Sequence, residues 1–431
     1  MRMEGPLLLF DHFELSTDNP MNMTNAKQDE AGAAGAKIRV RLKAGREKQI
    51  LRGSAWVFSG AIEEVDGAGA AGESADVFDT EGEWLGRGLW HPEADMAVRM
   101  YAQNPEETLD EAFWRGRIRR AVALRHRLYG PKADWRDTTA YRMVFSEADG
   151  LSGLIADQYA DVVALQVGSK VWEPWLPVVV DELKAATGAA CVSVRAEGEA
   201  VKREGLAEKL GGDPMPEVVT IRENGFVFEA GLSGGQKTGF YLDQRENRRK
   251  VAAYAKGREV LSAYCYTGAF EICAAHAGAA KIFGWDSSES ALAQARRHHE
   301  LNPSGVPAEY EVADVAHRLR FARDRRESWD LIILDPPRMV TRREGLERGL
   351  RAYKDVNLLA IKLLRPGGIL ATFSCSGLVD MAEFRKMVGW AAHDSERRVR
   401  ILETLGQPAD HPIPVEAPEC EYLKGLVCVV D

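Results

Sequence analysis

An acid and a thiol each follow an apolar run of this chain, at positions where they could act together. Asp335 comes directly after the run 331–334, and Cys375 comes just after the run 369–373. Both runs are typical of buried parallel strands, and the carboxyl ends of such strands hold the ligands of open α/β sheets. An acid at one strand end and a thiol at the other indicate covalent chemistry on a pyrimidine ring.

Length and composition limit the classes of protein to which the chain can belong. It has 431 residues, of which 45% are hydrophobic and 28% charged, so we expect two or three globular domains. No apolar stretch approaches the roughly twenty residues needed to cross a bilayer, and residues 1–37 lack the features of a signal peptide. The six cysteines include no Cys-x-x-Cys pair, which argues against a disulfide framework or a zinc site. We expect a cytoplasmic protein with reduced thiols, no metal and no membrane partner.

The charge of the chain is unevenly distributed. A net charge of −9 gives no global reason to expect a nucleic-acid partner. Residues 37–52, however, carry seven Lys and Arg side chains against one acid, and residues 115–127 carry six arginines. One such run is usually a solvated face, whereas two of them favour a polyanionic partner.

Two different patterns precede residue 231. Short alternating runs separated by glycine-rich breaks fill residues 37–103 and predict a small β-barrel. The next segment mixes helical and strand patterns, so we expect an α+β domain up to residue 230. Its predicted helices are 113–128 and 172–186, and its predicted strands are 142–146, 154–157, 162–167, 191–195, 218–222 and 226–229, the last two as a hairpin.

After residue 231, strands and helices alternate regularly, which predicts an α/β fold with a doubly wound, Rossmann-like sheet. We expect seven strands, and the last two have no comparable helix between them, so they could pair as antiparallel neighbours. Such a sheet suits an S-adenosylmethionine-dependent methyltransferase better than a dinucleotide-binding domain. The predicted strands are 259–263, 281–285, 309–312, 330–334, 369–373, 399–404 and 426–430.

The first strand of this sheet leads into a turn that could hold the cofactor. Gly268 lets a ligand approach the backbone closely and frees the amides at the start of the next helix. Asp286 ends the second strand, eighteen residues after Gly268, where an acid can accept hydrogen bonds from ribose hydroxyls. Asp314 ends the third strand, where an acid beside a bound adenine is expected. We add Tyr266, Thr267, Phe270, Ser287, Asp335 and Pro336 to the predicted cofactor site.

Several strings of the chain, in the right order, resemble the PUA-domain ribosomal RNA methyltransferases that make 5-methylcytosine in large-subunit RNA. They are residues 54–60, 141–151, 235–245, 266–270, 335–337, 353–357, 372–377 and 409–412, and they extend over nearly the whole chain from residue 37. The resemblance implies S-adenosylmethionine as the cofactor and large-subunit ribosomal RNA as the partner. It also implies a PUA-like RNA-binding β-barrel over 37–108, a central α+β domain over 109–230 and a methyltransferase domain over 231–431. The composition of residues 1–36 predicts a poorly ordered lead-in.

The resemblance assigns roles to the acid and the thiol. Cys375 would add to C6 of cytosine, which makes C5 nucleophilic and divides a hard methyl transfer into easier steps. Asp335 would hold the N3 and amino edge of the base. Cys265 is a competing thiol, but its place in the cofactor turn favours packing. By resemblance alone, four further residues are candidates for cofactor or substrate contacts: Lys237, Asp243, Gln244 and Arg245.

The chain departs from the family pattern after the two prolines. Arg338 and Met339 stand where the family usually has a lysine and an aromatic residue. Methyltransferases that act on exocyclic amino groups need an aromatic ring directly after the prolines, so this departure speaks against N-methylation.

Three other functions stay open. A small-molecule methyltransferase with the same sheet is the first alternative. A non-catalytic RNA-binding factor is the second, although it would have no need for both Cys375 and Asp335. A nicotinamide oxidoreductase is the third, and the chain lacks the glycine fingerprint of that class. The base that removes the C5 proton stays unassigned, and so does the choice between a monomer and a homodimer.

Overall fold

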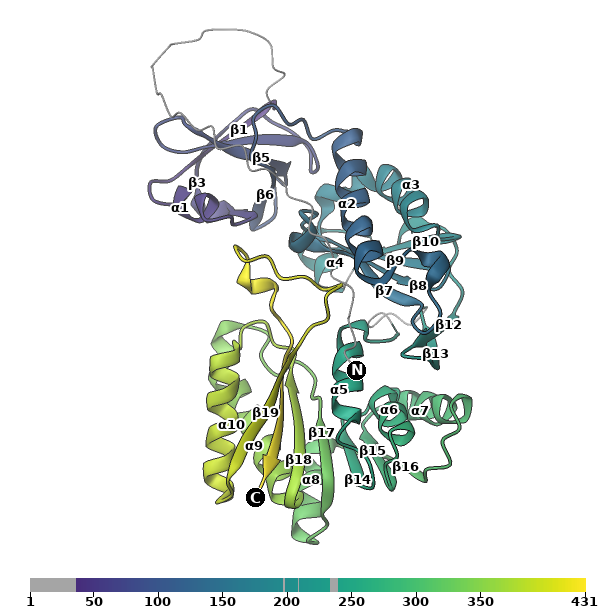
Figure 1. The fold of residues 1–431 in the computed structure, drawn as a ribbon. Helices are drawn as coiled ribbons and strands as arrows, with labels where there is room; N and C mark the ends of the chain where they lie inside the picture. Colours follow the sequence, from purple (N-terminus) through teal and green to yellow (C-terminus); the bar gives the residue numbers. More distant parts are fainter. Residues whose placement is uncertain (1–35, 197, 208, 233–238) are drawn as a thin grey trace, which may run out of the picture. The chain divides into compact units, whose positions relative to one another are not determined.

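The computed structural model describes residues 36–196, 198–207, 209–232 and 239–431. Apart from Ala36, the predicted lead-in lies outside the described residues. In the part of the chain that is described, the strands form sheets of six, five, two and seven strands (Figure 1). None of the helices in these ranges is long and apolar enough to cross a membrane. The same ranges hold no group of three or more His, Cys, Asp or Glu residues suited to a metal ion.

The N-terminal sheet has six strands, as expected for a small β domain. They are β1 (Ile38–Leu42), β2 (Trp56–Phe58), β3 (Ile62–Asp66), β4 (Ser74–Phe78), β5 (Trp84–Trp90) and β6 (Met96–Ala102), in the order β2-β6-β5-β4-β1-β3, with the short helix α1 (Glu47–Leu51) after β1. In β1, Ile38, Val40 and Leu42 are buried in the core, and Arg39 and Arg41 alternate with them on the exposed face. The first basic run therefore lies partly on a solvent-facing strand.

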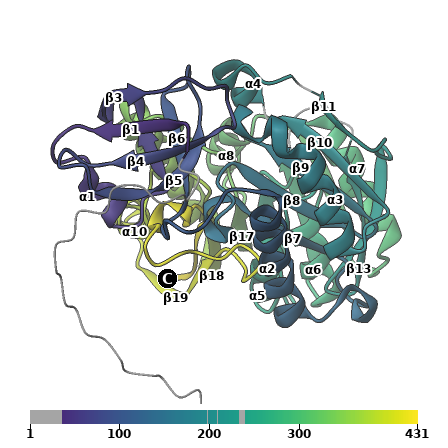
Figure 2. The same ribbon diagram turned by 90° about the horizontal axis from the view of Figure 1, so that it is seen from above.

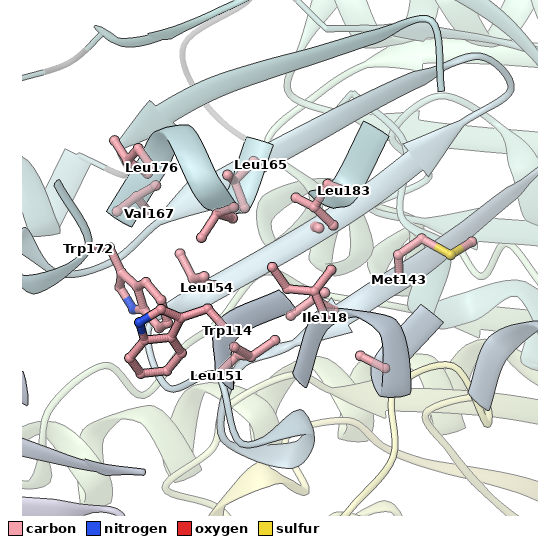
Figure 3. Packing of buried hydrophobic residues seen from close by; sticks show 14 of the residues in the cluster. Trp114, Ile118, Met143, Leu151, Leu154, Leu165, Val167, Trp172, Leu176 and Leu183 are labelled. Carbon is pink, nitrogen blue, oxygen red and sulfur yellow. The ribbon is translucent and has the colours of Figure 1, made fainter. Parts of the chain in front are cut away.

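The second sheet packs against two helices, α2 (Glu111–Tyr129) and α3 (Leu176–Thr187) (Figure 2). Its strands are β7 (Ala140–Phe145), β8 (Leu154–Tyr159), β9 (Val162–Val167), β10 (Cys191–Ala196) and β11 (Lys209–Gly212), in the order β11-β10-β9-β8-β7, with helix α4 (Gly198–Glu204) after β10. The rings of Trp114 and Trp172 meet edge to face at 4.8 Å in the core of this domain (Figure 3). The predicted hairpin is present as β12 (Val218–Glu223) and β13 (Phe226–Gly231).

One helix of this domain begins later than the sequence predicted. Residues Lys170–Trp175 form a 3-10 helix, and α3 starts only at Leu176. Pro174 explains the difference, because proline has no amide donor and disfavours the α conformation of the residue before it. The strand β11 was not predicted, and its Gly211-Gly212 pair gave no strand pattern.

The C-terminal sheet confirms the predicted seven-stranded methyltransferase-type fold. Its strands are β14 (Glu259–Ala263), β15 (Lys281–Asp286), β16 (Ala308–Val312), β17 (Trp329–Leu334), β18 (Leu364–Ser374), β19 (Val399–Gly406) and β20 (Lys424–Val430), in the order β16-β15-β14-β17-β18-β20-β19. The strand β20 pairs antiparallel with both β18 and β19. The helices are α5 (Arg245–Ala252), α6 (Ala269–His276), α7 (Glu289–Leu301), α8 (Val315–Asp324), α9 (Leu346–Leu363) and α10 (Met381–Ser395).

Helices cover both faces of this sheet. Helices α8, α9 and α10 share one apolar core with the strands, and α5 and α6 share another. The strand order reverses between β14 and β17, and open α/β sheets bind ligands at the carboxyl ends next to such a reversal.

The predicted domain limits stay predictions. The limit at residue 108 falls between β6 and α2, whereas the limit at residue 230 falls within β13. The strands of the hairpin β12–β13 belong neither to the five-stranded sheet before it nor to the seven-stranded sheet after it, so the sheets do not define the second limit.

Candidate active site

The turn after β14 has a strained backbone. Tyr264 and Tyr266 have φ values of 65° and 50°, and Gly268 has a φ of 79°. Non-glycine residues rarely adopt positive φ, and such strain is concentrated at functional sites. A Cβ atom at Gly268 would lie 2.9 Å from the Cβ atom of Ala295 in α7. Glycine is therefore required here both for the conformation and for the close approach of α7.

Two side chains hold this turn in place. Asp286, at the end of β15, accepts a hydrogen bond from the Tyr266 amide through Oδ2 at 2.9 Å. His298 of α7 lies 2.7 Å from the Thr267 carbonyl through Nδ1, and its Nε2 accepts from the Glu229 amide at 2.9 Å. Burial lowers the pKa of His298, so we assign a neutral ring with the proton on Nδ1. The sequence analysis missed His298, because its place in a helix carries no motif.

The acids that end β15 and β16 have structural partners as well. The Oδ1 atom of Asp286 accepts from the Ser288 amide, and Asp314 caps α8 by accepting from the His317 amide, both at 2.9 Å. Ser288 caps α7, whereas Ser287 is exposed. Each carboxylate oxygen retains a lone pair after these bonds. Two acids with free acceptor capacity beside a glycine cradle and the start of α6 fit a nucleoside cofactor such as S-adenosylmethionine.

Two residues of the turn region pack inward. Phe270 is buried, with its ring centroid 5.5 Å from that of Phe373. Cys265 is buried too, and burial together with the charges of Glu271 and Asp286 raises the pKa of its thiol well above the ordinary value. Cys265 is therefore a protonated thiol of low reactivity.

Asp335 lies at the end of β17 and is held from two directions. Its amide donates to the Ala263 carbonyl at 3.4 Å, and its Oδ2 accepts from Nε2 of Gln244 at 3.0 Å. The Oε1 atom of Gln244 in turn accepts from Nδ2 of Asn247 at 2.6 Å, which fixes the orientation of the amide. Pro336 follows as a buried residue. The carboxylate is thus positioned by groups that do not need to move when a substrate binds.

Cys375 follows β18 and is flanked by two fully buried serines. Ser374 and Ser376 are both 0% exposed, whereas Cys375 is partly exposed, as expected from the alternation of side chains along a strand. The Ser376 hydroxyl lies 2.9 Å from the Tyr353 hydroxyl and accepts from the Val340 amide at 3.2 Å. The serines anchor the strand end, and the thiol stands on its other side.

Tyr241 packs against the cofactor turn, and its phenol is influenced by the charges of Asp335 and Cys375. Its ring centroid is 5.2 Å from that of Tyr266. Burial raises the pKa of its phenol, and the nearby ionisable groups of Tyr266, Asp243, Asp335 and Cys375 add to the increase. The phenol of Tyr241, which the sequence analysis did not single out, is therefore electrostatically coupled to both the predicted acid and the predicted thiol.

Asp243 belongs to the same group of residues. Its Oδ2 accepts from the Tyr422 hydroxyl at 2.7 Å, and its Oδ1 is buried with no hydrogen-bond partner among the described residues. Burial and the charge of Asp243 raise the pKa of Tyr422 well above the usual value. Tyr422 lies just before β20, so the C-terminal strand contributes to the site.

Arg245 makes a buried ion pair. Its Nη2 atom lies 2.9 Å from Oδ1 of Asp410, and its guanidinium lies over the rings of Tyr129 and Tyr141 at 5.0 and 4.7 Å. Burial alone would raise the pKa of Asp410, but the adjacent His411 and Arg245 lower it below the usual range. These contacts connect α2 and β7 to the loop before β20. Lys237 lies outside the described residues.

The second basic run is largely occupied by internal partners. Arg119 pairs with Glu182 of α3 at 2.7 Å, and Arg125 is fully buried, 2.6 Å from Asp149. Arg115 also bonds to Glu182, at 3.2 Å. These arginines therefore give little support for the expected polyanionic partner, because their charges join α2 to its own domain.

Comparisons with known sequences give two family matches. A family model described as S-adenosylmethionine-dependent methyltransferase matches residues 184–411, and a model of a PUA-like domain matches residues 40–103. The chain is 42% identical to the ribosomal RNA large subunit methyltransferase I of Shewanella frigidimarina over 398 residues, which cover 91% of this chain and 99% of that one. It is 40% identical to the protein of the same name from Photobacterium profundum, over 90% of this chain and 98% of that one.

Comparisons with solved structures support the fold. A putative S-adenosylmethionine-dependent methyltransferase from Streptococcus mutans superposes with a TM-score of 0.77 at 20% identity, over 91% of this chain and 99% of that chain. The structure of SMU.776, a putative methyltransferase complexed with S-adenosylhomocysteine, gives 0.78 at 20% identity with the same coverage.

Proposed function

Because the chain belongs to the family of S-adenosylmethionine-dependent methyltransferases that carry a PUA-like domain, we propose that it methylates C5 of a cytosine in large-subunit ribosomal RNA. The observation that carries this proposal is that Asp335 and the partly exposed Cys375 follow the carboxyl ends of the paired parallel strands β17 and β18. An amino-group methyltransferase has no use for a nucleophilic thiol at that place.

The RNA substrate has separate support. The relatives from Shewanella and Photobacterium are named as large-subunit ribosomal RNA methyltransferases, and they align with nearly the whole of this chain. The exposed Arg39 of β1 adds positive charge to the PUA-like sheet, which suits contacts with phosphates, whereas Arg41 pairs with Glu64. Cytoplasmic location and a homodimer remain predictions.

The reaction begins with activation of the base by the thiol. S-adenosylmethionine, when bound, supplies an electrophilic methyl group. The thiolate of Cys375 forms a bond to C6 of cytosine, and the electron pair of the C5–C6 double bond then makes C5 nucleophilic. Once C5 carries the methyl group, its proton leaves to a base, the C6–S bond breaks and the Cys375 thiolate is restored.

Asp335 would act on the opposite edge of the ring. Its carboxyl group, held by Gln244, can bond to N3 and the exocyclic amino group and favour the form of the ring that carries a proton on N3. Since Asp335 lies at the end of β17 and Cys375 follows the neighbouring β18, the two groups can reach different atoms of one base. The target base must leave its stack to do so.

Transfer of labelled methyl groups to ribosomal RNA that lacks the modification tests this function. Wild-type protein should form 5-methylcytosine, Cys375→Ala should form none, and Cys191→Ala, which removes another partly exposed thiol, should match the wild type. RNA with 5-fluorocytosine should trap a covalent complex with the wild type and with Cys191→Ala but not with Cys375→Ala, because fluorine cannot leave C5 as a proton does. Methylation by Cys375→Ala would refute the covalent step, and transfer to small acceptors but not RNA would refute the substrate.

A further inference from the structure

Lys424 is a buried lysine beside the end of β18, the strand that Cys375 follows. Its side chain is 0% exposed, which is rare for lysine unless the charge has partners. Lys424 begins β20 and is paired with Ser374, the last residue of β18. Its ammonium donates to the Ser376 carbonyl at 2.7 Å and to the Tyr422 carbonyl at 2.8 Å.

The Ser376 carbonyl holds the ammonium at the strand end from which the thiol projects, without exposing it to a substrate. Residues opposite each other in an antiparallel pair share a face, so Lys424 lies on the side of Ser374 and not on the side of Cys375. The carbonyl that it bonds belongs to the residue directly after Cys375. The positive charge therefore acts on the thiol across the strand end.

The surroundings of Lys424 favour a charge that serves the thiol. The ionisable groups that face it are Cys375, Glu421, Asp380 and Arg338. Glu421 and Asp380 are exposed, so water screens their attraction more than that of a partner inside the protein. Burial lowers the pKa of Lys424 to about 8, so most molecules still carry the ammonium at neutral pH.

The attraction between Lys424 and Cys375 is mutual. A thiolate at Cys375 favours the ammonium form of Lys424, and by the same coupling the ammonium favours the thiolate. Cys375 also contributes to the raised pKa values of the phenols of Tyr241 and Tyr353, and burial, the largest cause for both, keeps these phenols neutral.

We propose that Lys424 is a positioning residue that keeps the Cys375 thiol ionised before it attacks the base and stabilises the thiolate when it leaves. The thiol proton passes to solvent, and the ammonium keeps its own protons throughout. This inference rests on the proposed role of Cys375 as nucleophile. A purely structural Lys424 would only join the ends of β18 and β20 through its two carbonyl bonds.

The rate of Cys375 alkylation by iodoacetamide, measured against pH on the full chain, tests this inference. The rate of Cys375→Ser is subtracted to remove the other thiols. Lys424→Met should raise the apparent pKa of the thiol by about one unit, which is about tenfold slower alkylation at pH 7. Lys424→Arg should restore most of the rate, and Lys281→Met, which removes a partly exposed lysine of β15, should leave the profile unchanged. A Lys424→Met profile equal to that of the wild type would overturn the inference.

A second measurement keeps Lys424 in place, in case its substitution prevents folding. The pKa of the Lys424 ammonium can be followed by NMR of protein labelled at the lysine side chains, with the Lys424 signal identified from Lys424→Arg. Cys375→Ser should lower this pKa by about one unit, since the thiolate no longer favours the ammonium. An unchanged value would show that the two groups are not coupled.

Neither measurement requires RNA or cofactor, so the two proposals can fail separately. If the thiol shows the coupling but Cys375→Ala still methylates RNA, the covalent function fails and the electrostatic pairing stands. If Cys375→Ala is inactive but Lys424→Met has the same alkylation profile as the wild type, the function stands and this inference fails.

Discussion

Two strand ends of the C-terminal sheet carry a cysteine, and their surroundings differ in sign. Cys265 follows β14, is buried, and faces the acids Glu271 and Asp286, which together with burial raise the pKa of its thiol well above the ordinary value. Cys375 follows β18, is partly exposed, and directly precedes Ser376, whose carbonyl accepts a hydrogen bond from the ammonium of Lys424. The reactivity of a cysteine at a strand end therefore depends on the charges near it, because these set the pKa of the thiol and the thiolate is the nucleophile.

Removal of each thiol is the strongest test of this comparison. Cys375→Ala should lower the rate of methyl transfer by roughly a thousandfold or more, because the loss of a nucleophile removes the whole covalent route. Cys265→Ala should retain activity within a few-fold, because that thiol only fills space. Rates with saturating S-adenosylmethionine and unmodified ribosomal RNA check both. A large loss in Cys265→Ala with an active Cys375→Ala would reverse the assignment.

The acid beside the active thiol should have the next largest effect. Asp335→Asn keeps the size of the side chain but cannot stabilise a protonated ring, so kcat should fall by roughly 10²-fold. Gln244→Ala removes the bond that orients the carboxylate, together with the bond that Gln244 accepts from Asn247, and should cost about tenfold. Single-turnover rates with RNA, compared with the Kd for S-adenosylmethionine, separate the loss of chemistry from the loss of binding. A Gln244→Ala effect larger than that of Asp335→Asn would contradict this order.

Glu271, the acid near Cys265, should affect the stability of the fold and not the rate of methyl transfer. Burial raises the pKa of Glu271 from its usual value of 4.5 to about 7. The folded state therefore holds its proton at pH values where the unfolded chain has lost it. The stability from this group is complete below pH 4.5, falls as the pH rises, and is lost above about 7.

Glu271→Gln should remove this pH dependence, because glutamine stays neutral. The variant should match the wild type near pH 4 and be more stable at pH 8 by up to about 3 kcal/mol in the free energy of unfolding. Urea denaturation at several pH values measures the difference. Parallel curves for the two proteins would show that Glu271 has an ordinary pKa in the folded state.

The sequence predicted the fold and the places of Asp335 and Cys375 at strand ends, because these depend on local patterns. Apolar runs with an acid or a thiol at the end are visible in sequence, and so is the regular alternation that gives the seven-stranded sheet. Lys424 could not be found in this way. Its ammonium bonds the Ser376 carbonyl, next to Cys375 in the chain, only because β20 inserts between β18 and β19. An antiparallel pairing of the last two strands does not by itself predict that insertion.

Partners far away in the chain also explain why the interpretation of the basic run in α2 as a binding face has little support. The density of charge suggested a face for a polyanionic partner. Three of the arginines have internal partners instead: Glu182 of α3 pairs with Arg115 and Arg119, and Asp149 pairs with Arg125. Tyr241 and His298 were missed for the same reason, since each acts on residues far away in the chain: Cys375 and Asp335 for the first, the Thr267 carbonyl for the second.

The smallest effect concerns the strained turn that holds Cys265, and two glycines make it measurable. Gly268 and Gly278 both have positive φ, 79° and 88°, so alanine at either should destabilise the fold by about 1 kcal/mol or more. A Cβ atom at Gly278 would meet nothing closer than 3.7 Å, whereas one at Gly268 would lie 2.9 Å from Ala295. Only Gly268→Ala should therefore also weaken S-adenosylmethionine binding, by about tenfold, as measured by titration calorimetry beside thermal unfolding. Equal losses of affinity in both variants would mean that general destabilisation, and not the shape of the turn, controls cofactor binding.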